Sequence, residues 1–100
     1  MKAIWNSKII AEADKKDCIY IEGNWYMPIS SVNMKMTKGS DTQYTCPWKG
    51  DCKYYDVGEG DDWAKDAMFQ YPNPKPSAID VVKKDFSNHV AFWNGVTVEE

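Results

Sequence analysis

The sequence contains no arginine: all 12 of its basic residues are lysines, and its 15 acidic residues give a net charge of −3. Arginine makes the bidentate contacts to phosphate and guanine that nucleic-acid-binding proteins favour. A basic patch is what attracts a protein to anionic lipid. An acidic chain without arginine therefore excludes a typical nucleic-acid-binding protein and a protein that attaches to a membrane surface by charge.

Long apolar segments are also missing. Lys8 interrupts the N-terminal region before an apolar stretch of signal-peptide length develops. No segment approaches the roughly 20 apolar residues that a membrane-spanning helix needs. We therefore expect a cytoplasmic protein. Its 100 residues suit one domain, residues 1–100, in which folding buries roughly two-thirds of the surface of the unfolded chain.

Cysteine and histidine are scarce. Cys18, Cys46 and Cys52 are an odd and irregularly spaced set that does not suit a disulfide framework, and no Cys-x-x-Cys motif occurs. A four-ligand zinc site would need all three together with His89, the one histidine, and their spacing is unlike that of zinc-binding modules. The acidic run 58–62 lacks the ligand spacing of a calcium loop. We therefore expect no metal and no cofactor.

Aromatic residues, by contrast, are abundant: 5 Trp, 6 Tyr and 3 Phe make up 14% of the chain. Short segments rich in aromatic and β-branched residues alternate with turn residues, a pattern typical of antiparallel strands. One segment, 77–84, has apolar residues at helical spacing after a proline. We predict a mainly β fold, a small single domain of short antiparallel strands with one short helix near 77–84. The predicted strands are 3–5, 8–12, 18–22, 25–27, 34–37, 43–46, 52–57, 67–71 and 88–93.

Turn residues connect these predicted strands. Turns are predicted at 6–7, 23–24, 40–42 and 94–95. The last of them is expected to close a hairpin between the final core strand and 96–98. Because the first and last hairpins share an aromatic-tipped pattern, we expect them to lie side by side, with Trp5 and Trp93 closing one end of the core. In the segment 34–37, alternation predicts that both methionines face inward.

Residues 45–50, Thr-Cys-Pro-Trp-Lys-Gly, form the most distinctive segment of the chain. With further segments in the same order, it resembles the family catalogued as domain of unknown function 427, which is also filed under a nucleotidyltransferase label. The segments that carry the resemblance are 3–6, 22–28, 40–42, 45–50, 54–55, 71–74 and 90–92. The resemblance implies a β-tent-like fold, similar to that of methionine-R-sulfoxide reductases and of the ligand-binding domain of cereblon. Many β-tent proteins carry zinc on paired cysteines, which this chain lacks.

The nucleotidyltransferase label can be tested against the residues present. Nucleotidyl transfer normally requires paired carboxylates that hold two metal ions, and a glycine-rich turn that binds phosphate. Residues 39–41, Gly-Ser-Asp, resemble such a turn weakly, but no Asp-x-Asp follows on a strand. The sequence therefore offers no physical basis for nucleotidyl transfer.

Five residues are candidates for binding a ligand. Pro47 places the Trp48 ring at a rigid corner, and Lys49 adds a charge beside it, so that a planar or anionic ligand could stack on the ring and pair with the lysine. The alternative is that Trp48 fills the core and Lys49 caps a turn. The hydroxyls and ring faces of three tyrosines could complete such a pocket, although strand alternation sends Tyr54 and its sequence neighbour to opposite faces. These tyrosines are Tyr26, Tyr54 and Tyr71.

Three residues are candidates for catalysis. Cys46 could act as a thiolate if the nearby lysine lowers its pKa, or it could be a small buried residue, since unpaired cysteine is often buried. Glu22 shares a strand face with Cys18, and it either braces the following turn in solvent or is partly buried as an acid or base. His89 could approach Cys46 in space if the last core strand crosses that turn.

Three functions remain open at this point. The first is a module that binds a small molecule or a peptide end in an aromatic pocket around residues 46–50. The second is an enzyme that uses Cys46 as a nucleophile or redox thiol, tuned by His89 or Lys49. The third is a partner-binding domain with exposed aromatic residues. We expect a monomer or a weak dimer, and the sequence alone does not decide whether the protein is an enzyme.

Overall fold

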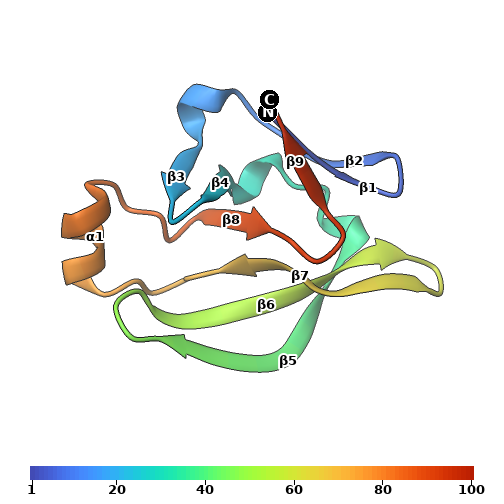
Figure 1. The fold of residues 1–100 in the computed structure, drawn as a ribbon. Helices are drawn as coiled ribbons and strands as arrows, with labels where there is room; N and C mark the ends of the chain where they lie inside the picture. Colours follow the sequence, from blue (N-terminus) through green and yellow to red (C-terminus); the bar gives the residue numbers. More distant parts are fainter.

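The computed structural model describes all residues from 1 to 100, and most of them lie in antiparallel strands (Figure 1). One short helix and three single turns of 3-10 helix, 15–17, 29–31 and 34–36, complete the fold. The chain is therefore mainly β with one short helix, as predicted. The elements are β1 (Lys2–Trp5), β2 (Lys8–Glu12), β3 (Ile19–Ile21), β4 (Asn24–Pro28), β5 (Thr37–Cys46), β6 (Gly50–Glu59), β7 (Asp62–Gln70), α1 (Pro76–Val82), β8 (His89–Phe92) and β9 (Thr97–Glu99).

The strands form two antiparallel sheets. The smaller sheet has the order β2-β1-β9, and the larger has the order β3-β4-β8-β7-β6-β5. In Figure 1 the small sheet lies along one side of the large sheet. The two chain termini lie close together, at the ends of β1 and β9 in the small sheet. The helix α1 stands at the far end of the large sheet. None of the helices has the length and hydropathy that crossing a bilayer requires.

Side chains are buried on both faces of the large sheet. One face packs against the small sheet and forms a first core, which includes Trp5, Met27 and Val90. The opposite face forms a second core, which includes Tyr26, Phe69 and residues of α1. Strand alternation explains the division, because neighbouring residues point to opposite faces. Tyr54 and Tyr55 accordingly pack against different cores, as predicted.

Tight turns set the register of the short hairpins. Asn6 and Ser7 both have positive φ, 51° and 64°, as a two-residue turn between β1 and β2 requires. In the β3–β4 hairpin Ile21 pairs with Asn24, so the turn is 22–23 and not 23–24. Glu22, with φ 51°, is therefore a turn residue rather than the last residue of a strand face.

Residues 34–36 form a turn of 3-10 helix, so the prediction of a strand there was wrong, and of the two methionines predicted to face inward only Met36 packs against the first core. The Asn33 side chain accepts the Lys35 N–H at 3.3 Å, and the Thr37 hydroxyl donates to the Met34 carbonyl at 2.9 Å. These local hydrogen bonds compete with an extended backbone. Met34 is left exposed as a result.

The prediction of a turn at 40–42 was also wrong, because β5 continues through it as an irregular stretch. Pairing with β6 is interrupted between Gly39 and Gln43, so one extended strand carries unpaired residues in its middle. The hydroxyls of Ser40 and Thr42 instead donate to the Asp66 carboxylate, at 2.5 and 2.7 Å. A long-range side-chain contact therefore replaces the missing ladder hydrogen bonds.

The last strand does not form a hairpin with β8. β9 pairs with β1 instead, with Ala3 opposite Val98, which places it in the small sheet. Trp5 is buried in the first core, whereas Trp93 is 46% exposed and contacts Phe69 on the opposite face of the large sheet. The expectation that the two tryptophans close one end of the core was therefore wrong. The turn at 94–95 carries the chain from one sheet to the other.

Candidate functional site

A pocket of about 430 Å³ lies on the face of the large sheet that carries the second core. We call it the aromatic pocket. It is bordered by the start of β4, by β5, β6 and β7, by the turn before β6 and by the residue after β8. Its seven lining residues are Asn24, Tyr44, Lys49, Tyr54, Phe69, Tyr71 and Trp93.

Three aromatic rings form one wall of the aromatic pocket. The rings of Tyr54 and Trp93 are nearly parallel, 14° apart, with centroids separated by 6.4 Å. Phe69 meets Trp93 edge to face at 5.5 Å, a preferred aromatic geometry. The Trp93 indole N–H donates to the Asp66 carbonyl at 2.5 Å, which fixes a ring that is still half exposed. The wall is thus rigid and open to solvent on one side.

Lys49 supplies the charge of the aromatic pocket. Its ammonium lies 2.6 Å from the Glu22 carboxylate, and the lysine side chain is only 8% exposed. The same ammonium lies 5.2 Å from the Trp48 ring centroid and 4.9 Å from that of Tyr71, within the range of cation–π attraction. The Lys49 ammonium donates a hydrogen bond to the Glu22 carboxylate and attracts its negative charge, and both effects lower the pKa of the Glu22 carboxyl.

The backbone around Lys49 is held by the proline-rich loop that follows β7. The Lys75 N–H donates to the Lys49 carbonyl at 2.9 Å, and the Lys75 ammonium donates to the Pro47 carbonyl at 2.8 Å. Gly50 has φ 115°, and a Cβ there would lie 3.3 Å from the Asn73 carbonyl oxygen. Glycine after Lys49 therefore permits both the backbone conformation and the close approach of the loop.

Hydroxyl and thiol groups gather in the second core, some lining the aromatic pocket and others below it. Burial raises the pKa of Tyr26 and of Tyr71 well above the usual range, and it raises the pKa of Tyr54 to about 12. Burial also raises the pKa of the Cys52 thiol, which lies in the same core as Tyr71. The Tyr26 hydroxyl is fully buried and has no hydrogen-bond partner. Cys46 is buried beside the same tyrosines.

The structure brings most of the predicted site residues together. Lys49, Tyr54 and Tyr71 line the aromatic pocket. The other predicted residues around it are Glu22 and Trp48, which contact Lys49, and Tyr26 and Cys46, which lie in the core below.

His89 contacts a different part of the chain. Its Nε2 lies 3.2 Å from the Asp17 carbonyl oxygen, and its Nδ1 is buried without a partner. The expectation that His89 approaches Cys46 has no contact to support it, because the histidine packs against the 3-10 turn 15–17.

Four residues of the aromatic pocket were not predicted from the sequence: Asn24, Tyr44, Phe69 and Trp93. Phe69 could have been found, because it is two residues before Tyr71 and shares its face by strand alternation. Trp93 could not, since its orientation depends on the hydrogen bond of its indole N–H to the Asp66 carbonyl, 27 positions away in the sequence.

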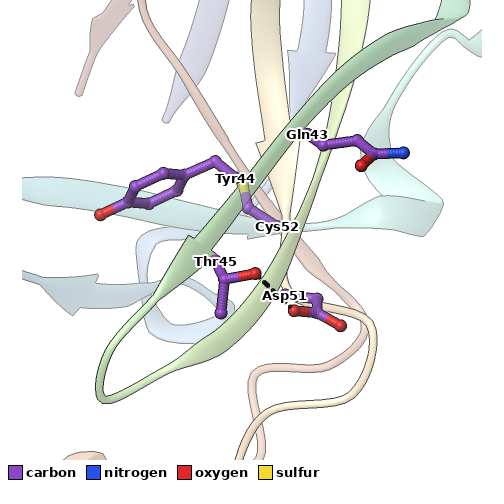
Figure 2. A pocket seen from close by; sticks show the side chains of 5 residues that line it. All are labelled: Gln43, Tyr44, Thr45, Asp51 and Cys52. Atoms are coloured by element: carbon purple, nitrogen blue, oxygen red, sulfur yellow. Dashed lines mark hydrogen bonds between the residues drawn. The ribbon is translucent and has the colours of Figure 1, made fainter.

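A second pocket, of about 440 Å³, lies at the open edge of the large sheet near the β5–β6 turn (Figure 2). It is lined by Gln43, Tyr44, Thr45, Asp51 and Cys52. Figure 2 shows Gln43 and Tyr44 pointing to opposite sides of the strand, and the Thr45 hydroxyl donating to Asp51 at 2.8 Å. Only two of its five lining residues are hydrophobic, against five of seven in the aromatic pocket, so it offers a ligand less apolar surface. No three His, Cys, Asp or Glu side chains anywhere are grouped to hold a metal ion.

Comparison with known protein families identifies the family of this chain. Residues 1–100 match the family model described as Domain of unknown function (DUF427). No curated protein matches the chain. The chain belongs to the DUF427 family, and the resemblance seen in the sequence is thereby confirmed.

Proposed function

We propose that this member of the DUF427 family binds a small planar molecule, or the terminal residue of a peptide, in the aromatic pocket. The observation that carries the proposal is the combination of rigid aromatic walls with one buried ammonium at the same opening. Binding sites for small molecules typically have this composition, with apolar walls that provide most of the affinity and a few polar groups that fix orientation.

The open aromatic wall provides the driving force. Trp93 is 46% exposed although its indole N–H is anchored, so its ring face is held in place without being covered. A planar ligand that covers the ring removes apolar surface from water at roughly 25 cal/mol per Å². Because the anchored ring loses little freedom on binding, little of this gain is offset by ordering of the side chain.

Two polar side chains line the aromatic pocket together with the rings. Lys49 comes from the turn before β6, and Asn24 from the start of β4. A ligand that stacks on Trp93 therefore shares the pocket with an ammonium and an amide. This arrangement favours a molecule with one planar face and one hydrogen-bonding end.

The thiol alternative has weaker support. Cys46 is 6% exposed and does not line the aromatic pocket. A nucleophilic thiol needs access to its substrate and a depressed pKa, which electropositive and partly exposed surroundings provide. The buried position among tyrosines favours a structural role for this cysteine.

The proposal is tested with a planar probe of simple chemistry, 2-naphthamide, by titration calorimetry and by the thermal shift of the protein. We expect saturable binding that Trp93→Leu weakens about tenfold, which is the effect of losing about 1.4 kcal/mol of stacking and burial. The matched control is Trp63→Phe, since Trp63 lies on β7 with its ring under Lys38 and outside the aromatic pocket. No binding of the probe, or equal loss in both variants, would overturn the proposal.

A further inference from the structure

The Glu22–Lys49 ion pair is unequal in burial. The Lys49 side chain is 8% exposed and lines the aromatic pocket, whereas the Glu22 side chain is 55% exposed and does not line it. The ammonium is therefore a fixed part of the pocket, held between two aromatic rings. The carboxylate reaches it from the rim.

Few contacts hold the Glu22 carboxylate in this position. It lies at the tip of the β3–β4 hairpin, and its ion pair with the Lys49 ammonium is the contact that holds it there. The tip is open, since a Cβ on Gly23 would meet only the Tyr20 hydroxyl, at 4.0 Å. The carboxylate can turn away into water without disturbing either core.

A buried ammonium, in contrast, is stabilised by an anionic partner, either Glu22 or an anionic ligand. Leaving the Lys49 charge unpaired inside the protein would incur a large desolvation penalty. A ligand that carried a carboxylate could replace Glu22 one for one and keep the charge balanced. A neutral ligand would leave the ion pair intact, and a cationic ligand would meet the Lys49 charge.

We propose that Glu22 occupies the anion subsite of the aromatic pocket in the unliganded protein, and that the carboxylate of a planar ligand displaces it to pair with Lys49. This inference rests on the proposed function and specifies its ligand class as planar carboxylates. Glu22 then sets both the affinity and the selectivity of the pocket, because each ligand must compete with an internal carboxylate of the same chemistry. No bond is made or broken in the exchange.

The test compares 2-naphthoate, 2-naphthamide and 2-naphthylmethylamine, which share one ring system and differ in charge. In the unmodified protein 2-naphthoate is expected to bind most tightly. The variant Glu22→Gln removes the competing charge, so its affinity for 2-naphthoate rises about fivefold, the effect of losing one partly exposed ion pair. Its affinity for 2-naphthamide stays the same.

A matched control separates this effect from a change in net charge. Glu59 also lies near a hairpin tip and pairs with a lysine, Lys8, but it is remote from the aromatic pocket. Glu59→Gln therefore changes net charge equally and leaves the affinity for all three probes unchanged. Glu22→Asn is a second variant that suits the positive φ of the turn and gives the same tightening for 2-naphthoate.

Two outcomes distinguish this inference from the proposed function. If the naphthoate and the naphthamide bind equally, and Glu22→Gln behaves like Glu59→Gln, the displacement of Glu22 is wrong and the pocket still binds planar molecules. If none of the three probes binds, the proposed function itself is wrong. Tighter binding of the amine than of the naphthoate would also overturn the inference, because it would make Glu22 the ligand-binding charge.

Discussion

The Trp93 indole N–H donates to the backbone carbonyl of Asp66 at 2.5 Å, which connects the wall of the aromatic pocket to a strained residue of β7. Asp66 has φ 55°, a left-handed conformation that is unfavourable for most residues. Its N–H donates to the Asp56 carboxylate at 2.9 Å, and its own carboxylate accepts the two hydroxyls of the irregular stretch of β5. The position of the Trp93 ring therefore depends on how β5, β6 and β7 are joined at Asp66.

Replacing Asp66 is expected to destabilise the protein and to loosen Trp93. Asp66→Ala loses two hydrogen bonds to a carboxylate and keeps the positive φ, so the free energy of unfolding should fall by about 2–4 kcal/mol. Asp66→Gly loses the same hydrogen bonds but fits the backbone, and it should be more stable than the alanine variant by about 1 kcal/mol. Urea unfolding followed by tryptophan emission measures both changes.

A neighbouring aspartate provides the control. Asp41 lies between the two hydroxyl donors on β5, is exposed and makes no side-chain hydrogen bond or ion pair. Asp41→Ala should change the free energy of unfolding by less than about 0.5 kcal/mol. If Asp66→Gly is less stable than Asp66→Ala, backbone strain at Asp66 contributes little to the free energy of unfolding.

Local sequence patterns located most of the strands, but they did not determine which strands pair. Strand alternation correctly separated Tyr54 from Tyr55, and the turn 6–7 was placed correctly from its polar residues. The pairing of β9 with β1 could not be predicted, because it depends on contacts between the two ends of the chain. The turn at 94–95 is present, but the residues of a turn do not determine which sheet the following strand joins.

The same distinction applies to the candidate site. Lys49 and Tyr71 were found because they follow rigid or distinctive local features, a Pro-Trp corner and a strand that leads into prolines. Glu22 was singled out for its possible burial among apolar residues, whereas its role depends on the ion pair with Lys49 across 27 positions of sequence. Trp93 was expected to close one end of the core together with Trp5, but it packs against Phe69 of the second core, because its orientation depends on the hydrogen bond to the Asp66 carbonyl.

Two glycines near the β6–β7 turn are expected to differ strongly on substitution. A Cβ on Gly58 would lie 2.1 Å from the Asp62 carbonyl oxygen and 2.7 Å from the Trp63 Cα, both backbone atoms that cannot move aside cheaply. Gly58→Ala should therefore cost more than about 3 kcal/mol or prevent folding, as severe overpacking does. Thermal and urea unfolding of the purified variant measure the loss.

Gly60→Ala is the matched comparison. A Cβ there meets nothing within 4 Å, so the only cost is the φ of 56°. A loss of about 1 kcal/mol is expected, which is the strain of one L residue in the left-handed region. Equal losses for the two variants would contradict the close approach of β6 and β7 at Gly58.

Alkaline pH is expected to destabilise the protein through the groups of the second core. Burial raises the pKa of Cys52 above its ordinary value of 9.0, and it raises the pKa of Tyr54 from 10.0 to about 12. The unfolded state therefore loses these protons at lower pH than the folded state does. Above about pH 9 the unfolded state therefore binds fewer protons than the folded state. The free energy of unfolding then falls as the pH rises above about 9.

Denaturant titrations between pH 7 and pH 11 measure this decline. Cys52→Ala removes one of the groups, and the decline between pH 9 and pH 10 should be shallower in this variant than in the unmodified protein. Lys53→Ala, an exposed change at the adjacent position, should leave the slope unchanged in that range. A free energy of unfolding that stays constant up to pH 11 would show that the thiol and phenol groups ionise freely in the folded state.

Slow thiol labelling is the expected behaviour of all three cysteines in the folded protein. Cys18, Cys46 and Cys52 are free and buried, and burial raises the pKa of both Cys18 and Cys52. At pH 8, iodoacetamide should modify each of them at least about tenfold more slowly in the native protein than in urea, because the thiolate is the reactive form and the native thiols are inaccessible. Mass spectrometry of peptides from timed reactions gives the rate at each cysteine. Rapid labelling of Cys46 alone would instead favour the thiol enzyme over the binding module, since a buried structural cysteine has no reason to react before the other two.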